Sequence, residues 1–137
     1  MSRTPFLLIL PILLLLSGPG VSTAQDVDAE VNAVVRRLER GDAKALMVSS
    51  ADRLELALFG ATRRYSRAQA TYVIEDFFRQ YPPRRVIRVE GAGTDQAWFG
   101  SLSYEYARGS RPLDLFVRMR REGSDWVLNE LIVREEG

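Results

Sequence analysis

Residues 66–83 read SRAQATYVIEDFFRQYPP, and this stretch decides the fold. Its apolar residues recur at intervals of three and four, which predicts a helix with one buried face: Ala70, Val73, Ile74, Phe77, Phe78 and Tyr81. Ser66 followed by Gln69 is the pattern of a capping box, in which each side chain accepts a hydrogen bond from the backbone N–H of the other residue. Pro82 and Pro83 end the helix, because proline cannot donate the next backbone hydrogen bond.

Four runs with the composition of strands follow this helix. They span residues 86–90, 97–107, 113–121 and 126–134. Short connections rich in Gly and Ser separate the last three, and such connections favour hairpins. The second half of the chain is therefore predicted to be an antiparallel meander.

Two helices and one strand are predicted before the capping box. In residues 26–40 the apolar side chains share one face, acidic residues come first and basic residues last, as the helix dipole favours. Residues 42–50 indicate a short second helix, and residues 53–59 alternate in polarity like a half-buried strand. The order α-α-β-α-β-β-β-β predicts an α+β fold with a curled antiparallel sheet packed on helices.

Residues 1–24 have the pattern of a secretory signal peptide. A basic residue precedes an apolar run of eleven residues at 6–16, and small residues lead to a cut between Ala24 and Gln25. The run is shorter than the roughly 20 residues that cross a bilayer. We expect export to the periplasm or the medium, a single domain over 25–137, and no integral membrane segment after cleavage. An uncleaved anchor is the alternative.

The composition excludes several kinds of chemistry. The chain of 137 residues has 19 Lys and Arg against 18 Asp and Glu, with neither His nor Cys. It therefore has no thiol nucleophile, no Ser-His-Asp triad and no zinc site built from His and Cys. We expect no metal and no cofactor. The near-zero net charge argues against nucleic acid as a partner.

Several short motifs resemble those of one family. They are Gly-Asp-Ala at 41–43, Tyr-Ser-Arg-Ala-Gln-Ala at 65–70, Asp-Phe-Phe at 76–78, and the strand segments 99–102 and 126–131. Together they resemble an uncharacterised bacterial family of small exported proteins, a domain of unknown function with a nuclear transport factor 2-like fold. Ketosteroid isomerases and many small binding domains share that fold. The resemblance implies the fold and an export route, but no catalytic residue, because the family has no assigned activity.

Alternation within the predicted strands assigns side chains to the two faces of the sheet. Trp98, Tyr104 and Tyr106 share one face and, with Arg118, are the candidate ligand-binding residues of a pocket between sheet and helix. In residues 113–121 one face holds Leu113, Leu115, Val117 and Met119, and the other holds Asp114, Phe116, Arg118 and Arg120. Strict alternation in the last strand groups Trp126, Leu128, Glu130 and Ile132. Because both faces are partly apolar, we expect a second layer outside the sheet, which a homodimer would supply.

Two classes of function remain open. The first is a non-enzymatic exported domain that binds a small apolar ligand or a partner protein of the envelope. The second is an isomerase or dehydratase with a carboxylate base in an apolar pocket and a Tyr donor. Asp114, Glu105 or Glu130 would be the base, and Tyr104 or Tyr106 the donor. The competing interpretation of these carboxylates is cross-strand ion pairing with arginine on a solvated face.

An excess of arginine between residues 63 and 88 raises a third hypothesis, adhesion to anionic lipid or polysaccharide. Only Glu75 and Asp76 oppose seven arginines there: Arg63, Arg64, Arg67, Arg79, Arg84, Arg85 and Arg88. An ordinary solvated surface is the alternative.

Overall fold

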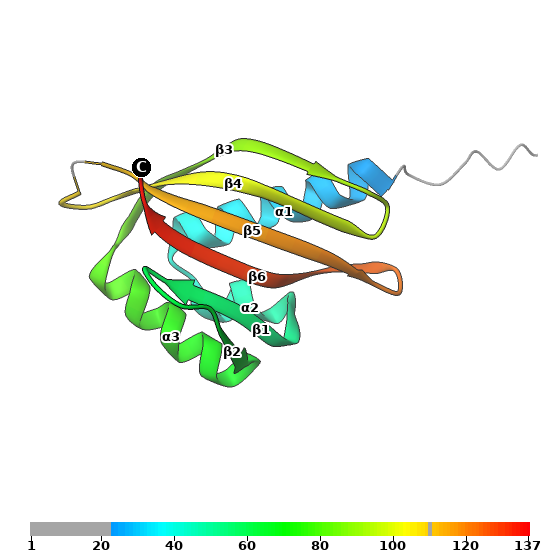
Figure 1. Cartoon of the computed structure of the whole chain (residues 1–137), viewed down its shortest axis with the longest axis horizontal. Helices are drawn as coiled ribbons and strands as arrows, with labels where there is room; N and C mark the ends of the chain where they lie inside the picture. The colour runs from blue at the N-terminus through cyan, green and yellow to red at the C-terminus, as the bar shows by residue number, and fades with distance from the viewer. Residues whose placement is uncertain (1–22, 110) are drawn as a thin grey trace, which may run out of the picture.

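The computed structural model describes residues 23–109 and 111–137, with side chains from residue 27 onward. The predicted signal peptide thus lies outside the described residues except for its last two. The described elements are α1 (Thr23–Arg40), α2 (Ala43–Val48), β1 (Ser50–Leu58), β2 (Arg63–Ser66), α3 (Arg67–Gln80), β3 (Pro83–Gly93), β4 (Ala97–Tyr106), β5 (Leu113–Glu122) and β6 (Asp125–Glu135). The predicted α+β class, with a curled sheet packed on helices, is confirmed (Figure 1).

One sheet contains all six described strands, in the order β2-β1-β6-β5-β4-β3. Neighbouring strands are antiparallel except β1 and β6, which are parallel, so the sheet is mixed. The parallel pair needs a long crossover, and α3 lies within it. The short strand β2 was not predicted. Figure 1 shows α1 running behind β3, β4 and β5, so the sheet has an inner face toward the helices and an outer face away from them.

The inner face and the helices form a single hydrophobic core. The predicted apolar face of α3 is buried at Ala70, Ile74, Phe77 and Phe78. The α1 residues in the core are Val27, Val31, Val34 and Leu38. The predicted capping box is present: the Ser66 hydroxyl accepts the Gln69 N–H at 3.2 Å, and the Gln69 side chain accepts the Ser66 N–H at 3.1 Å. Local signals in the sequence therefore fix where α3 begins and which side it buries.

A β-bulge changes the side-chain pattern of β6. Arg118 pairs with Glu130 and Met119 pairs with Leu128, which leaves Asn129 as the extra residue. A bulge shifts the alternation, so every position after it changes face. Glu130 therefore lies on the outer face together with Ile132, whereas Trp126 and Leu128 lie inside. The prediction that these four share one face was wrong.

The Trp98 ring lies on the inner face of the sheet, above Gly91 and Gly100, which have no side chains. A Cβ atom on Gly91 or Gly100 would overlap that ring, so the two glycines make room for it. The Arg88 guanidinium lies over the ring, 5.6 Å from its centroid, and donates to Asp28 of α1 at 3.1 Å. Trp98 thereby connects the β3–β4 hairpin to the first helix.

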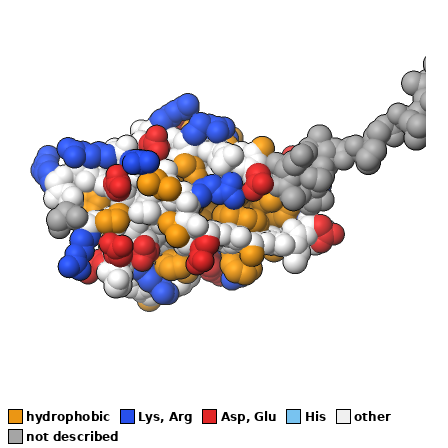
Figure 2. Space-filling model, turned by 90° about the horizontal axis from the view of Figure 1, so that it is seen from above, with side chains coloured by type: hydrophobic (Ala, Val, Ile, Leu, Met, Phe, Trp, Pro, Cys, Tyr) orange, Lys and Arg blue, Asp and Glu red, His pale blue; other side chains and the backbone are white. Residues whose placement is uncertain are grey.

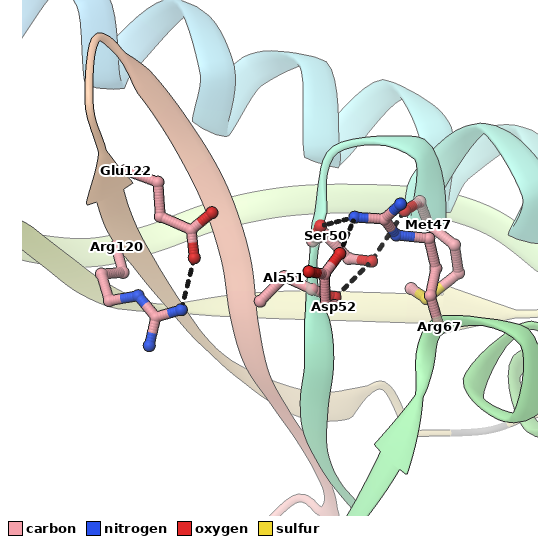
Figure 3. A network of polar contacts seen from close by, with 7 residues as sticks. All are labelled: Met47, Ser50, Ala51, Asp52, Arg67, Arg120 and Glu122. Atoms are coloured by element: carbon pink, nitrogen blue, oxygen red, sulfur yellow. Dashed lines mark hydrogen bonds and ion pairs between the residues drawn. The ribbon is translucent and has the colours of Figure 1, made fainter.

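Arg67 joins the start of α3 to the start of β1 (Figure 3). Its guanidinium donates to the Ser50 carbonyl at 2.8 Å and to the Asp52 carboxylate at 3.0 Å. The Ser50 hydroxyl is buried and donates to the Met47 carbonyl at 2.7 Å. These bonds fix the corner where the chain leaves α2 and enters the sheet.

Replacing Gly91 with Ala tests the packing of Trp98. The added methyl group would push the indole out of place, and overpacking of this kind costs about 1–3 kcal/mol. We expect urea unfolding, followed by tryptophan fluorescence, to show that loss of stability. Gly60→Ala is the matched control, because the nearest atom to a Cβ there is 4.0 Å away. Equal stability of the two variants would contradict this account of the packing.

Candidate functional site

Side chains fill the space between the sheet and the helices. Phe77, Trp98 and Tyr104 are at most 4% exposed and belong to the core. A groove of about 570 Å³ lies instead on the outer face of the sheet. This outer-face groove is lined by residues that include Ala92, Phe99, Phe116, Arg118, Glu130 and Ile132.

The strand register arranges the outward side chains in three rows across the sheet. The first row is Ala92, Phe99, Arg118, Glu130, Glu55 and Arg64. The second row is Glu90, Ser101, Phe116, Ile132 and Ala57. The third row is Ile87, Ser103, Asp114 and Arg134. The groove therefore has an aromatic and aliphatic floor, with charged side chains on both sides of it.

The charged end of the first row contains two carboxyl groups between two arginines. Arg64 contacts Glu55 at 3.4 Å, and the Arg118 Nε atom lies 3.9 Å from the Glu130 carboxylate. Glu55 and Glu130 are register partners across β1 and β6, so their carboxyl groups can share a hydrogen bond when one of them is protonated. Burial raises the pKa of Glu130, and the hydrogen bond with Glu55 raises it further, although Arg118 opposes both. The pKa of Glu55 is lowered, by the hydrogen bond with Glu130 and then by Arg64.

The structure does not bring the four candidate ligand-binding residues together. Trp98 and Tyr104 are buried in the core, and Tyr106 packs on Tyr81 with ring centroids 5.1 Å apart. The Tyr104 hydroxyl donates to the Tyr81 carbonyl, and burial raises the pKa of Tyr104. Only Arg118 lines the outer-face groove.

The three candidate carboxylates all lie on the outer face. Glu130 lines the groove, Asp114 lies in the third row, and Glu105 is exposed opposite Arg85 on β3. The candidate donors Tyr104 and Tyr106 point to the inner face, so the predicted base and donor are on opposite sides of the sheet. The contact between Arg118 and Glu130 matches the cross-strand ion pairing considered as the competing interpretation.

Sequence reasoning did not single out Glu55, Phe99 or the ring of Phe116 as parts of a site. Phe116 was placed correctly on the polar face of its strand. An aromatic side chain among the polar side chains of each of two adjacent strands was the available signal. Glu55 had no such signal, because its contact with Glu130 depends on the parallel pairing of β1 and β6.

Four of the seven arginines between residues 63 and 88 form separate ion pairs. Arg64, Arg67 and Arg79 contact carboxylates at 3.0–3.4 Å, and Arg88 does so at 3.1 Å. The face seen in Figure 2 likewise has basic and acidic side chains side by side, with hydrophobic side chains between them. These ion pairs neutralise part of the arginine excess that an anionic lipid or polysaccharide would contact.

Within the described part of the chain, no group of three or more acidic side chains is placed to hold a metal ion. No helix described there is long and apolar enough to cross a membrane.

Replacing Glu130 with Gln tests the carboxyl pair. A pKa raised in the folded state means that Glu130 favours folding while protonated, and this contribution is lost as the pH rises through the folded-state pKa. Gln resembles the protonated form, so we expect E130Q to be more stable than the wild type at neutral pH. The two stabilities should converge below the ordinary glutamate pKa of 4.5. Urea unfolding between about pH 4 and pH 8 measures the difference.

Glu105→Gln is the matched control, because it removes a carboxylate from the outer face at a position away from Glu55 and Glu130. An E130Q variant that is less stable than the wild type at neutral pH would show that Glu130 acts there as an ion-pair partner of Arg118.

Known structures of the same fold include several proteins of low sequence identity. A DUF4783 family protein from Bacteroides ovatus ATCC 8483 has a TM-score of 0.71 and 13% identity, over 77% of this chain and 94% of that chain. A DUF4783 family protein from Bacteroides fragilis YCH46 has a TM-score of 0.70 and 15% identity, over 76% of this chain and 96% of that chain. A nuclear transport factor 2-like protein of unknown function from Silicibacter pomeroyi DSS-3 has a TM-score of 0.59 and 15% identity, over 85% and 100% of the two chains.

These structures are similar in fold alone, and the fold is nuclear transport factor 2-like, as the sequence motifs implied. Comparison with curated protein sequences finds no match. The model of DUF4783, a domain of unknown function, matches residues 31–134. Because that match covers most of the chain, the protein belongs to the DUF4783 family.

Proposed function

We propose that the chain is an exported, non-enzymatic binding domain that contacts a partner protein through the outer-face groove. One observation carries the proposal: core side chains fill the inner space, whereas the outer face has an open groove with exposed aromatic rings. Phe99 is 59% exposed and Phe116 is 39% exposed. Covering such rings would contribute about 25 cal/mol per Å² of apolar surface removed from water.

The shape and chemistry of the groove favour a protein over a small apolar ligand. Small ligands bind where roughly 70–90% of their surface is buried, and this groove is open to solvent along the sheet. An apolar centre with aromatic residues and a charged rim is the usual composition of a protein interface. Phe99 and Phe116 form that centre here, and Arg118, Glu130 and Arg134 lie around it.

The raised pKa of Glu130 favours a second candidate function, an enzyme that uses this carboxyl group as acid or base. An isomerase also needs a donor for the developing oxyanion on the same side of the sheet. Tyr104 and Tyr106 face the other side, and Arg118 is the cation that contacts Glu130. Binding is therefore the better supported function.

Export is supported by the sequence pattern of residues 1–24 and has its own test. We expect the intact mass of the protein from the envelope or medium of its native cells to correspond to a chain that begins at Gln25. A mass that still includes residues 1–24 would support the uncleaved anchor instead.

Site-specific photo-crosslinking in native cells tests the binding surface. We expect a crosslinking phenylalanine derivative at position 99 to yield an adduct of discrete mass. The control is the same derivative at Tyr72, which is 74% exposed on α3, on the helix side of the sheet. No adduct at position 99, or the same adduct at both positions, would overturn the proposal.

A further inference from the structure

We propose that a pocket at the C-terminal end of β6 binds a quaternary ammonium group of the choline type. The pocket has a volume of about 210 Å³ and shares no lining residue with the outer-face groove. It lies where β1 and β6 end and where β5 begins (Figure 1). Three aromatic residues line this aromatic pocket: Phe59, Tyr81 and Tyr106.

The three rings are inclined to one another and form a concave surface. The Tyr81 ring centroid lies 5.2 Å from that of Phe59 and 5.1 Å from that of Tyr106, and the ring planes meet at 40° and 80°. Other contacts fix both tyrosines. Tyr81 stacks on Phe77, and the Gly109 backbone packs so closely on the Tyr106 ring that a Cβ atom would overlap it. The aromatic pocket is therefore formed before a ligand binds.

Phe59 has a backbone conformation that its side chain does not favour. Its φ is 60°, in the left-handed region that glycine adopts easily and bulky residues adopt rarely. The Phe59 N–H donates to the Val133 carbonyl at 3.0 Å, so this strained residue continues the pairing of β1 with β6. Phe59 is nevertheless 40% exposed. Strain at an aromatic residue outside the core is typical of a ligand site.

The charges at the aromatic pocket favour a cation. Glu135 and Glu136 line it together with Arg111, so acidic side chains exceed basic ones. A cation over a Phe or Tyr ring is also attracted by the negative face of that ring. The rings and the carboxylates therefore act in the same direction.

A quaternary ammonium group fits this lining better than a primary ammonium group. A primary ammonium is strongly hydrated and has N–H donors that need acceptors, which aromatic rings supply poorly. A trimethylammonium group has the charge without any N–H, and its methyl groups can contact the rings. Cavities of about 150 Å³ already admit benzene, which has more heavy atoms than this group.

Isothermal titration calorimetry of the purified protein with choline tests the proposal. Two matched probes are ethanolamine, which lacks the three methyl groups, and dimethylbutanol, the uncharged analogue in which carbon replaces nitrogen. We expect saturable binding of choline and at least about tenfold weaker binding of both probes, because the charge and the methyl contacts are both needed. Absence of choline binding, or equal affinity for all three compounds, would overturn the proposal.

Variants at the aromatic pocket locate the site. Phe59→Leu keeps an apolar side chain but removes the ring face, so the affinity for choline should fall about tenfold. Tyr72→Leu, which removes an exposed ring from α3, is the matched control and should leave the affinity unchanged. Unchanged affinity in a folded Phe59→Leu protein would show that choline binds elsewhere.

A second variant serves if urea unfolding shows that Phe59→Leu does not fold. Glu135 and Glu136 are exposed, so replacing both with Gln should leave the fold intact. We expect this double variant to bind choline more weakly and with less dependence on salt than the wild type. Wild-type affinity and salt dependence in the double variant would contradict the role of the carboxylates.

Sedimentation with vesicles distinguishes a free ligand from a lipid headgroup that carries the same group. Binding to phosphatidylcholine but not to phosphatidylglycerol vesicles, lost in Phe59→Leu, would assign the group to a lipid. Choline binding without vesicle binding would assign it to a free ligand. Both results support the aromatic pocket, and neither depends on whether position 99 crosslinks to a partner.

Discussion

The extra residue in β6 determines the chemistry of both faces of the sheet. Before Asn129, Trp126 and Leu128 point into the core. After it, Leu131 and Val133 continue that apolar face, and Glu130 and Ile132 point outward. Without the bulge, a continued alternation would place Glu130 in the core and Leu131 outside it. The charged row, the groove and the contact between Glu130 and Glu55 all depend on this single irregularity.

Tight packing of the inner face leaves the outer face as the open surface of the sheet. A sheet that curls around helices can enclose a pocket, but here large side chains occupy that space. Trp98 fills the region above two glycines, and Tyr104 uses its hydroxyl to hold the end of α3 at Tyr81. Residues that could have lined an internal cavity therefore stabilise the fold.

The parts of the fold that the sequence predicts are those that depend on local interactions. The capping box and apolar face of α3 involve residues within a few turns of one helix, and β5 alternates without interruption, so both were predicted correctly. The bulge in β6 and the parallel pairing of β1 with β6 depend on the register between strands, which the pattern within one strand does not contain. The strand β2 was missed because it has only four residues, although it pairs with β1 close by in the chain. The same holds for the candidate site. Arg118 could be identified from the pattern of its own strand, but Glu55 lies beside Glu130 only because β1 pairs with β6 in parallel.

The charges of the outer face and its aromatic rings have different explanations. Ion pairing between adjacent strands would account for Arg118 and Glu130 on a solvated sheet, where each pair contributes under about 1 kcal/mol. It gives no reason for Phe99 and Phe116 to lie exposed between the charges. The reversed order of acid and base in the first and third rows follows from the antiparallel pairing of β5 and β6, because both strands have an acid, an apolar residue and an arginine in the same order. Exposed aromatic rings beside charged side chains are typical of a protein interface, which is why the partner protein is proposed to contact this face.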